Sequence, residues 1–564
     1  MFYRVNMADF SVKQEDRPQY QGLGGRALSS RIIAAEVDSN VHALSAENKL
    51  IFVTGLLTGT GAPNTGRMSL GAKSPLTGTI KESNVGGSMG YKLGRLGVRG
   101  IIVEGLPAEE GDLYVLHISA AGGFLHALPE LRGLNIYDTV AKLQERFGSE
   151  VAIGCIGSAG ENKMASACVG FTDMEGVPSH QAGRGGIGAV MGCKSLQALV
   201  CDDGGAENVR CVDEAAFRRG AQKLAKALLM HPATGQAIPP AGREVLKRII
   251  NEPDLLGCSE DDHAGSRLLL ETTNEPEGRV GHSCLPGCLI GCAHSHNNKK
   301  KLRPKRGETE TCWGFGPNLG INNLEDVALM NRLCDDYGVD AIEMAVSLGI
   351  VTEAGVAAFG DGKAAVGLIQ EVGKATYLGR ILGAGAETVG KVFGVRRVPV
   401  VKGQGIPAYD PRALKGVGVT YATSTMGADH TAGYAVGTNL PQAGEGAAGK
   451  KEGQVVLSRN LQIATAFFDS AGLCLFVAAA VLDIPEGLEG IVEMCNARHG
   501  WAKTLEDYLE TGKQVLREER AFNRAAGIAD GADNLPDFFR TEPLAPDNVV
   551  YDISKEELNK LFDF

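Results

Sequence analysis

The sequence has no long apolar run. Its longest apolar stretch, residues 473–482, is about half of the roughly 20 residues that a helix needs to cross a bilayer. The N-terminus has no apolar segment of the signal-peptide kind, because charged residues between Lys13 and Arg17 follow soon after Met1. These absences argue against a membrane span and against export, so we expect a soluble protein that stays in the cytoplasm.

The sequence also lacks an excess of basic residues, tandem repeats and low-complexity tracts. Its formal net charge is −11, which argues against nucleic-acid binding because phosphate neutralisation needs a concentrated basic surface. Its hydrophobic content of 44% and charged content of 22% are those of a globular protein. A chain of 564 residues is too long for one hydrophobic core, and we expect two to four domains.

Glycine and cysteine are the informative residue types. Glycine accounts for 76 of the 564 residues, roughly twice the usual share of about 7%. The backbone must therefore turn tightly, or approach a ligand closely, at many places. The 13 cysteines are an odd number spread over a large chain, which fits a reducing compartment in which some thiolates bind metal.

The hydrophobic pattern changes along the chain and predicts an α+β fold. Up to about residue 205, short apolar runs between glycine-rich turns predict β-strands at 50–53, 100–103 and 151–156, with one helix at 137–147. Later, apolar residues at helical spacing predict helices at 215–230, 324–337, 341–356, 460–482 and 504–526. We predict a β-rich N-terminal domain (1–205) followed by two mainly helical domains (206–405 and 406–564).

The densest chemical signal is the cysteine loop Cys284-Leu-Pro-Gly-Cys288-Leu-Ile-Gly-Cys292. Three thiolates at this spacing fold readily around one soft metal centre, but a cubane iron–sulfur cluster normally takes four cysteines. His294 or His296 could complete a zinc site of the Cys3His type instead, or the cysteines could bind nothing. The spacing alone leaves zinc and iron–sulfur open.

Several glycine-rich and acidic segments resemble, in the same order, those of the tungsten-containing aldehyde:ferredoxin oxidoreductase family. Besides the cysteine loop, they are Gly55-Leu-Leu-Thr-Gly-Thr-Gly-Ala-Pro63, Lys73-Ser-Pro-Leu-Thr-Gly78, Ser83-Asn-Val-Gly-Gly87, Gly160-Glu-Asn162, Gly183-Arg-Gly-Gly-Ile-Gly-Ala-Val-Met-Gly192, Asp335-Asp-Tyr-Gly-Val-Asp340, Ile406-Pro-Ala-Tyr-Asp-Pro-Arg412 and Asp469-Ser-Ala-Gly-Leu-Cys474. Each piece alone is weak evidence, but the ordered set covers nearly the whole chain.

The resemblance implies the cofactors and the residues that hold them. Cys474 would join Cys284, Cys288 and Cys292 on one [4Fe–4S] cluster, which favours iron–sulfur over zinc. A tungsten (or molybdenum) centre would be held by two pterins, each bound by one acidic element: Asp335, Gly338 and Asp340 for one, and Asp469, Gly472 and Leu473 for the other. A carboxylate can accept hydrogen bonds from ring N–H groups, although each element taken alone reads equally well as a glycine-capped helix end.

The N-terminal glycine segments would surround the pterin phosphates, because closely spaced backbone amides form anion sites. By resemblance, Arg67 lies between cluster and pterin, and Asn84 lies near a Mg²⁺ ion that bridges the phosphates. Gly86 and the loop of Gly183, Arg184 and Gly185 flank them. The plainer alternative is a set of ordinary turns with a surface arginine.

The chemistry that the resemblance implies is oxidation of an aldehyde to a carboxylic acid, or the reverse. Glu310 and His430 align with the family's acidic residue and histidine near the metal and would form an acid–base pair, the glutamate with a pKa raised by burial. Glu308 competes with Glu310 for this role. The basic run at 299–306 would receive an acidic electron carrier such as ferredoxin, although most such runs are merely solvated loops.

Other functions remain open from the sequence. The chain could be the catalytic subunit of a multi-subunit reductase that resembles benzoyl-CoA reductase, or a zinc-stabilised binding protein without redox activity. The family's inter-subunit iron site uses a Glu-x-x-His element, but Leu329 and Arg332 occupy those positions here. The resemblance therefore implies no shared iron and puts the family's homodimer in doubt.

Overall fold

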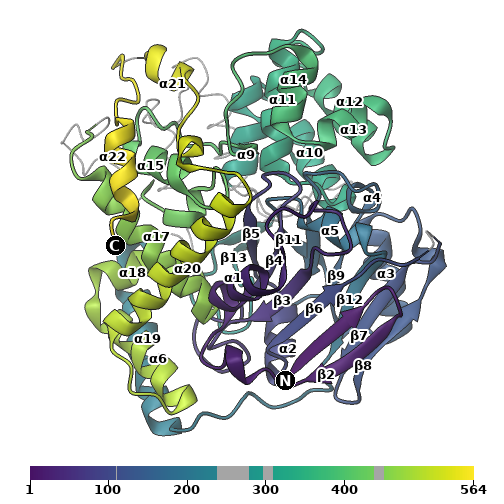
Figure 1. Ribbon diagram of the computed structural model, residues 1–564, viewed down its shortest axis with the longest axis vertical. Coiled ribbons are helices and arrows are strands. Elements are labelled where there is room, and N and C mark those ends of the chain that lie inside the picture. The colour runs from purple at the N-terminus through teal and green to yellow at the C-terminus, as the bar shows by residue number, and fades with distance from the viewer. Residues whose placement is uncertain (109–110, 238–278, 296–308, 437–449, 546) are drawn as a thin grey trace.

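Two six-stranded mixed sheets form the N-terminal part of the protein (Figure 1). The computed structural model describes residues 1–108, 111–237, 279–295, 309–436, 450–545 and 547–564. The first sheet has the order β2-β1-β6-β3-β4-β5, built from β1 (Phe2–Asn6), β2 (Ser11–Glu15), β3 (Leu50–Thr54), β4 (Met68–Lys73), β5 (Ile80–Val85) and β6 (Gly100–Glu104). Its strands pair antiparallel except for β1 and β6, which run parallel.

The second sheet packs on the first across a shared core. Its order is β11-β10-β9-β12-β7-β8, built from β7 (Tyr114–Ser119), β8 (Gly122–Ala127), β9 (Ala152–Cys155), β10 (Val169–Thr172), β11 (Pro178–Ala182) and β12 (Leu196–Asp202). Side chains such as Phe52 and Leu70 from one sheet and Phe171 and Leu199 from the other form one hydrophobic cluster. The predicted strands at 50–53, 100–103 and 151–156 correspond to β3, β6 and β9.

Five helices accompany the sheets, where the sequence predicted one. Helix α3 (Ile136–Phe147) is the predicted helix, and the structure adds α1 (Gly25–Glu36), α2 (Met89–Arg95), α4 (Ser158–Glu161) and α5 (Ile187–Cys193). Helix α1 escapes a hydrophobic-pattern search because it buries the polar residues Arg26, Ser29 and Ser30. The other three are at most seven residues long, too short for a helical periodicity to appear.

The rest of the chain is mainly helical and forms two groups above and beside the sheets (Figure 1). The upper group contains α9 (Thr309–Phe315), α10 (Leu324–Tyr337), α11 (Ala341–Glu353), α12 (Gly362–Gly373), α13 (Tyr377–Gly383) and α14 (Ala386–Phe393). The other contains α15 (Lys415–Thr423), α17 (Gln454–Ala471), α18 (Val477–Asp483), α19 (Pro485–His499), α20 (Leu505–Ala525), α21 (Phe538–Thr541) and α22 (Lys555–Asn559). A β-rich part followed by helices confirms the predicted α+β class.

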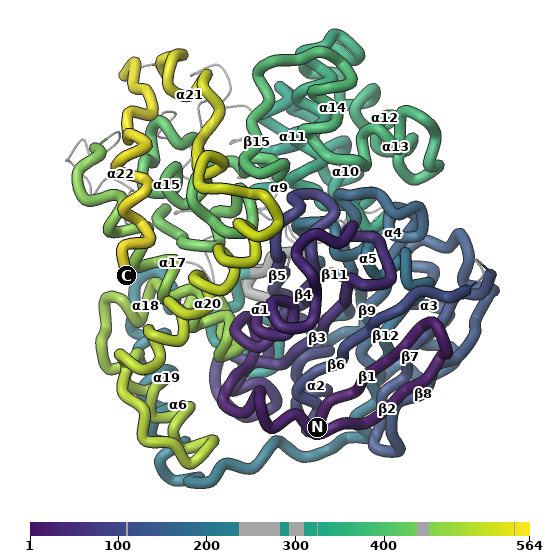
Figure 2. The backbone as a smooth tube through the Cα atoms, viewed as in Figure 1, coloured from purple at the N-terminus to yellow at the C-terminus, as the bar shows by residue number. Residues whose placement is uncertain are grey.

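Two features of the helical part refine the sequence prediction. Helix α6 (Glu214–Met230) lies against α19 although the two are far apart in the sequence (Figure 2). The helix predicted at 460–482 is two helices, α17 and α18, because Gly472 adopts a left-handed conformation and ends the first one.

Small antiparallel pairs are formed by β13 (Arg279–His282) with β14 (Ala293–Ser295) and by β15 (Val400–Val401) with β16 (Gln404–Gly405). Among the helices that the structure describes, none has the length and apolar character to cross a bilayer.

A buried ion pair joins helix α1, which lies on the first sheet, to helix α20 near the C-terminal end of the chain. The guanidinium of Arg26 donates from Nε to Oε1 of Glu519 at 2.9 Å and from Nη2 to Oε2 at 2.7 Å. Ser30 donates a further hydrogen bond to Oε1 of Glu519, and both charged side chains are 1% exposed. Nη1 of Arg26 also lies 3.6 Å from Oδ2 of Asp469, so this pair fixes one of the predicted pterin elements.

We expect Glu519→Gln to destabilise the protein by about 3–5 kcal/mol, because it leaves the charge of Arg26 buried without its partner. The measurement is the shift of the thermal unfolding midpoint at a fixed scan rate. The control is Lys391→Met, which breaks an exposed pair with Glu387 and should cost less than about 0.5 kcal/mol. Equal shifts for the two variants would contradict the structural importance of the pair.

Candidate functional site

The four predicted cluster cysteines come together from two distant segments. Cys284, Cys288 and Cys292 lie in the loop between β13 and β14, and Cys474 follows the end of α17. The pKa of the Cys284 thiol is raised well above its usual value by a hydrogen bond with Cys288, by burial and by the charges of Cys474 and Cys292. These interactions require all four sulfur atoms to lie in one neighbourhood.

Asn64 ties the cysteine loop to the Cys474 segment. Its backbone N–H donates to Gly287 O at 3.0 Å, and its carbonyl accepts from the N–H of Cys474 at 3.0 Å. Its side chain donates to Sγ of Cys288 at 3.5 Å and accepts from the N–H of Leu289 at 2.9 Å. Asn64 adopts a left-handed conformation, with φ of 54°, which asparagine tolerates better than most residues.

The donor set fits an iron–sulfur cluster. The hydrogen bond from Cys284 lowers the pKa of the Cys288 thiol to about 5, outweighing its burial, with the N–H of Gly291 as a further donor. A thiolate is the form that binds metal, and each cysteine of a cubane binds a separate iron. His294 and His296 were the candidate zinc ligands. His296 and the side chain of His294 lie outside the described part of the chain. In that part, no group of three His, Cys, Asp or Glu side chains is arranged to hold a single metal ion.

The two predicted pterin elements share one backbone design. Helix α10 ends at Gly338 and helix α17 ends at Gly472, both left-handed, with φ of 68° and 82°. The next residue of each element forms an isolated antiparallel bridge to the sheet domain, Val339 with Ala167 and Leu473 with Thr65. The plain helix-cap interpretation is thus correct locally, and each cap docks its acidic element on a different sheet.

Each glycine of these caps is required by close packing. A Cβ atom on Gly472 would collide with the hydroxyl of Thr58, and one on Gly338 would lie 3.0 Å from the backbone nitrogen of Gly157. The amide of Arg67 donates to Gly472 O at 3.2 Å, and the amide of Cys168 donates to Gly338 O at 2.8 Å. The loops after the helices are therefore pinned to the sheet domain on both sides.

The first acidic element is bound to Arg184. Asp340 caps α11 by accepting from the N–H of Ile342 at 3.0 Å, and its Oδ2 accepts from Nε of Arg184 at 3.1 Å. Asp335 lies near the same thiol as Asp340. The pKa of the Cys168 thiol is raised well above its usual value by burial and then by the charges of Asp340 and Asp335. The structure therefore brings Arg184, Asp335 and Asp340 together.

The donors of Arg184 are largely used by the protein itself. Besides Asp340, it donates to Ala428 O at 2.6 Å, to Gly405 O at 2.6 Å and to Glu343 Oε2 at 3.4 Å. Its side chain is 9% exposed. Arg184 thus joins the segments of Asp340, Gly405 and Ala428, whereas the resemblance implied only that its loop flanks the pterin phosphates.

The second acidic element lies beside Arg26, Glu82 and Arg67. The pKa of the Asp469 carboxyl is raised well above its usual value by burial and by the charge of Glu82, against the opposing charges of Arg26 and Arg67. Arg67 hydrogen-bonds through Nε to the side chain of Asn84 and through Nη2 to its backbone oxygen. A Cβ on Gly86 would lie 3.4 Å from Nη1 of Arg67, so Arg67, Asn84 and Gly86 form one group next to the Cys284 loop.

Glu310 and His430 form a direct pair. Oε1 of Glu310 lies 3.2 Å from Nε2 of His430 and accepts from the hydroxyl of Tyr409 at 3.1 Å. The hydroxyl of Tyr409 also lies 3.2 Å from that of Tyr434, and the rings of His430, Tyr409 and Tyr434 pack against one another. Glu308, the alternative to Glu310, lies outside the described residues.

The pKa of Glu310 is shifted in the direction opposite to the sequence expectation. Burial alone would raise it, but the hydrogen bond and the charge of His430, together with the hydrogen bond from Tyr409, lower it overall. The carboxyl is therefore ionised at neutral pH. The sequence interpretation was wrong here because it weighed desolvation without the donors that the fold supplies.

Open space and an unbonded polar group lie beside Arg184. Among the described residues, no atom lies within 4 Å of a Cβ built at Gly183, whereas one at Gly185 would collide with the side chain of Lys81. The hydroxyl of Tyr421 is buried without a hydrogen-bond partner among the described residues. It interacts electrostatically with Arg184 and Glu310. An added polar group at this place would therefore find a donor and room.

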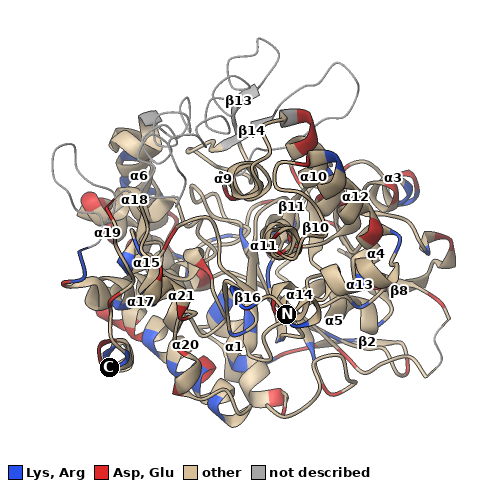
Figure 3. Ribbon diagram, turned by 90° about the horizontal axis from the view of Figure 1, so that it is seen from above, with Lys and Arg blue, Asp and Glu red and all other residues tan. Residues whose placement is uncertain are grey.

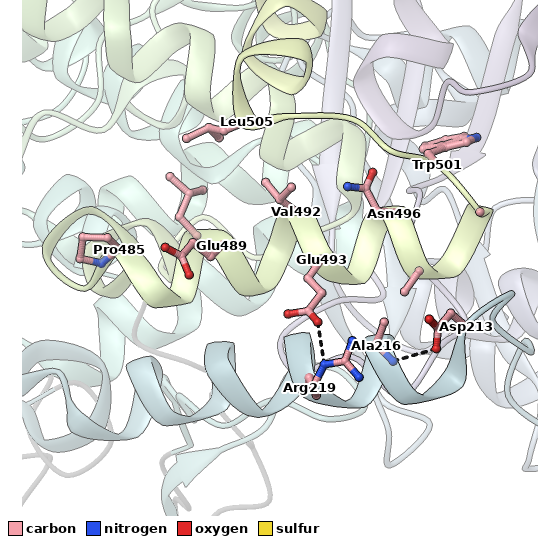
Figure 4. Close-up of a pocket in the computed structure, with 13 residues that line it drawn as sticks. Asp213, Ala216, Arg219, Pro485, Glu489, Val492, Glu493, Asn496, Trp501 and Leu505 are labelled. Carbon is pink, nitrogen blue, oxygen red and sulfur yellow. Dashed lines mark hydrogen bonds and ion pairs between the residues drawn. The ribbon is translucent and has the colours of Figure 1, made fainter.

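A hollow elsewhere on the protein is unrelated to these residues. It has a volume of about 840 Å³ and lies between α6 and α19 (Figure 4). The ion pair of Arg219 with Glu493 crosses it at 3.1 Å, and none of the predicted site residues lines it. Acidic and basic residues are interspersed over the described surface (Figure 3), and the basic run 299–306 lies outside the described residues.

Sequence reasoning missed several residues of the site. Nothing in the sequence pattern singled out Asn64, Lys81 or Glu82. A polar residue after a proline, and neighbouring residues of opposite charge in a strand, are both typical of exposed positions. Tyr409 stood inside a segment that carried the family resemblance, and Asp429 directly precedes His430. These two could have been found by asking which neighbours would position an acid–base pair.

Comparisons with known proteins agree along the whole chain. The model of the aldehyde ferredoxin oxidoreductase N-terminal domain matches residues 2–203, and the model of domains 2 and 3 of the same enzymes matches residues 223–563. The tungsten-containing aldehyde ferredoxin oxidoreductases of Pyrococcus furiosus and Pyrococcus horikoshii are 31% and 32% identical, each over 96% of this chain and 91% of the relative.

Two more distant proteins are also similar. The aliphatic sulfonate oxidoreductase WOR-like subunit of Pyrococcus furiosus is 25% identical over 93% of this chain and 86% of its own. The solved active-site complex BamBC of benzoyl coenzyme A reductase with 1,5-dienoyl-CoA superposes with a TM-score of 0.78, covering 100% of this chain and 93% of the other at 17% identity. At that identity the likeness concerns the fold alone.

Proposed function

Since this chain belongs to the aldehyde ferredoxin oxidoreductase family and is an oxidoreductase of the tungsten type, we propose that it oxidises an aldehyde to a carboxylic acid or catalyses the reverse. Oxidation adds one water-derived oxygen to the carbonyl carbon and releases two protons and two electrons. The observation that carries the proposal is the Glu310–His430 pair at 3.2 Å, with Tyr421 interacting electrostatically with both Glu310 and Arg184. The chain would act in the cytoplasm, where its thiols stay reduced.

Cys284, Cys288, Cys292 and Cys474 are proposed as the ligands of one [4Fe–4S] cluster. This is supported by the electrostatic contact of the four sulfur atoms and by the N–H donors around Cys288. The cluster would pass electrons one at a time to ferredoxin or to a partner subunit. The basic run 299–306 stays a predicted docking site for that acceptor.

The two acidic elements are proposed to hold the two pterins of a tungsten or molybdenum centre. Asp335, Gly338 and Asp340 would bind one ring, and Asp469, Gly472 and Leu473 the other. Around the phosphates, the proposed residues are Arg67, Asn84, Gly86, Gly183, Arg184 and Gly185, with Asn84 beside a Mg²⁺ ion. Because the donors of Arg184 go to Asp340, Glu343 and two carbonyls, its proposed part is to fix Asp340 in place.

The acid–base chemistry falls to Glu310 and His430. When bound, the metal centre supplies a Lewis acid and accepts the two electrons. The ionised Glu310 would take a proton from the water whose oxygen adds to the carbonyl carbon. His430 shares that proton through Nε2, and Tyr409 holds the carboxylate in a fixed orientation by its hydrogen bond.

The proposal predicts aldehyde-dependent reduction of a viologen dye by the purified protein under anoxic conditions. Metal analysis should give roughly four irons per chain together with tungsten or molybdenum and releasable pterin. Zinc without iron or pterin would contradict the proposal and favour a zinc-stabilised binding protein. The assay should include small aliphatic and aromatic aldehydes.

A second candidate is the catalytic subunit of a larger reductase complex. It is favoured by the likeness to BamBC and to a protein described as a subunit. In this case a protein loaded with iron, tungsten and pterin would not reduce dye with any aldehyde. Aldehyde-dependent dye reduction by the isolated chain would exclude it.

A further inference from the structure

Lys81 in strand β5 is a buried lysine whose ammonium group the protein leaves without a hydrogen bond. The side chain is 1% exposed, and Nζ has no hydrogen-bond partner among the described residues. The other lysines with buried side chains in that part of the chain donate to protein oxygens: Lys73, Lys194, Lys402 and Lys415. A buried ammonium carries three donors and is costly to leave unpaired.

The surroundings of Lys81 are those of the first acidic element. Nζ forms an ion pair with Oδ2 of Asp429 at 3.6 Å, which lies beyond hydrogen-bond distance, so its three N–H donors are unused although its charge has a partner. Burial lowers the pKa of Lys81, as does the charge of Arg184, whereas the carboxylates of Asp429, Glu82 and Asp340 oppose this. The charged groups that face Lys81 thus come from the strand itself, from the Arg184 loop, from the cap of α11 and from the segment before His430.

The stem of Lys81 directs the ammonium toward this element. A Cβ on Gly185 would lie 2.6 to 2.7 Å from Cγ, Cδ and Cε of Lys81, so the aliphatic stem runs along the backbone of the loop that carries Arg184. Gly185 has a φ of +88°, and no other residue type would leave room for the stem. The packing therefore fixes the position of Nζ and of its three N–H donors.

Lys81 and Arg184 differ in how many of their donors the protein itself uses. Arg184 makes four hydrogen bonds to the protein and holds Asp340. Lys81 makes none, although it is equally enclosed. Lys81 is thus the cation at this place whose donors remain available to an added group.

We propose that Lys81 is a cofactor-binding residue whose ammonium group donates hydrogen bonds to an oxygen or ring nitrogen of the pterin on the Asp340 side. The inference rests on the proposed function in that a pterin must occupy this region. It adds a contact from the first sheet to a cofactor otherwise held by the helical part and the Arg184 loop. The same oxygen could in principle come from substrate, and the test separates the two.

The test measures how fast pterin leaves the purified holoenzyme of Lys81→Met in native buffer, followed by the fluorescence of the oxidised pterin. Methionine keeps a stem of similar length and removes the donors. We expect release to be faster by about tenfold or more, as for the loss of a hydrogen bond to a charged group, with iron content unchanged. If Lys81→Met does not accumulate, Lys81→Gln, which keeps one donor group without the charge, should show a smaller increase.

Lys402→Met is the matched control. Lys402 is buried and bonded to Asp533, Ala422 and Ser424, so its loss should destabilise the fold without removing a donor that faces Asp340. Equal release from both methionine variants, or unchanged release with only a higher KM for the aldehyde, would overturn the inference. Absence of pterin from the wild-type protein would instead contradict the proposed function itself.

Discussion

Replacing Cys474 by serine is expected to abolish aldehyde-dependent dye reduction and to release iron. Cys474 is the one predicted ligand outside the β13–β14 loop, and its amide is bonded to Asn64 O at 3.0 Å. Loss of merely supporting residues lowers metal affinity by about 10–100-fold, so loss of a ligand should lower it by more than about 100-fold. Iron per chain and the electron paramagnetic resonance signal of the reduced cluster give the measurement.

Cys495→Ala is the control for this variant. Cys495 is buried in α19 within the same hydrophobic cluster as Cys474, and burial raises the pKa of its thiol to about 12. Its replacement should leave the iron content and the activity close to those of the wild type. A Cys474→Ser protein that kept its full iron content and activity would remove Cys474 from the ligand set.

Glu310→Gln is expected to lower kcat by about 10²–10⁴, the usual contribution of a positioned acid or base. Glutamine retains an oxygen that can accept from Tyr409 but cannot take a proton from water. Iron, tungsten and pterin per chain should stay at wild-type values, because the bonds that the described residues make to Glu310 come from His430 and Tyr409.

The pH dependence gives an independent test of Glu310. A carboxyl group is in its basic form at a pH above its pKa. Because the pKa of Glu310 is lowered from the ordinary value of 4.5, kcat/KM of the wild type should fall only below about pH 4.5 on the acid side. Tyr434→Phe, which removes a neighbour of Tyr409 and no group bonded to Glu310, should reduce kcat far less. Comparable losses in both variants would assign the effect to packing and not to proton transfer.

The sequence predicted the long elements well and the short ones poorly. Helix α10 has the predicted bounds of 324–337, because fourteen residues are enough for a helical period to appear. Helix α1 was missed because its buried face contains Arg26, which pairs with a glutamate 493 positions away. Local periodicity carries no information about such a distant partner. The domain boundaries near 205 and 405 remain predictions.

For the site, the residue types were predictable but their partners were not. Cys284, Cys288 and Cys292 could be named from their spacing, whereas Cys474, Glu310 and His430 could be named only from the family resemblance. The contacts of Arg184 with Gly405 and Ala428 depend on where two distant loops fold, so its crosslinking part could not be anticipated. Lys81 and Glu82 look like exposed residues of an edge strand, yet they are 1% and 5% exposed.

The matching ends of α10 and α17 have a consequence for the route of the electrons. Both helices end at a left-handed glycine that is followed by a short bridge to a sheet, so the two helix ends have the same backbone design. They differ at the last residue, where one half ends in the carboxylate of Asp340 and the other in the thiol of Cys474. Of these two helix ends, only that of α17 offers a thiol, so under the proposed function the cluster would lie on the α17 side of the metal centre and electrons would enter or leave there.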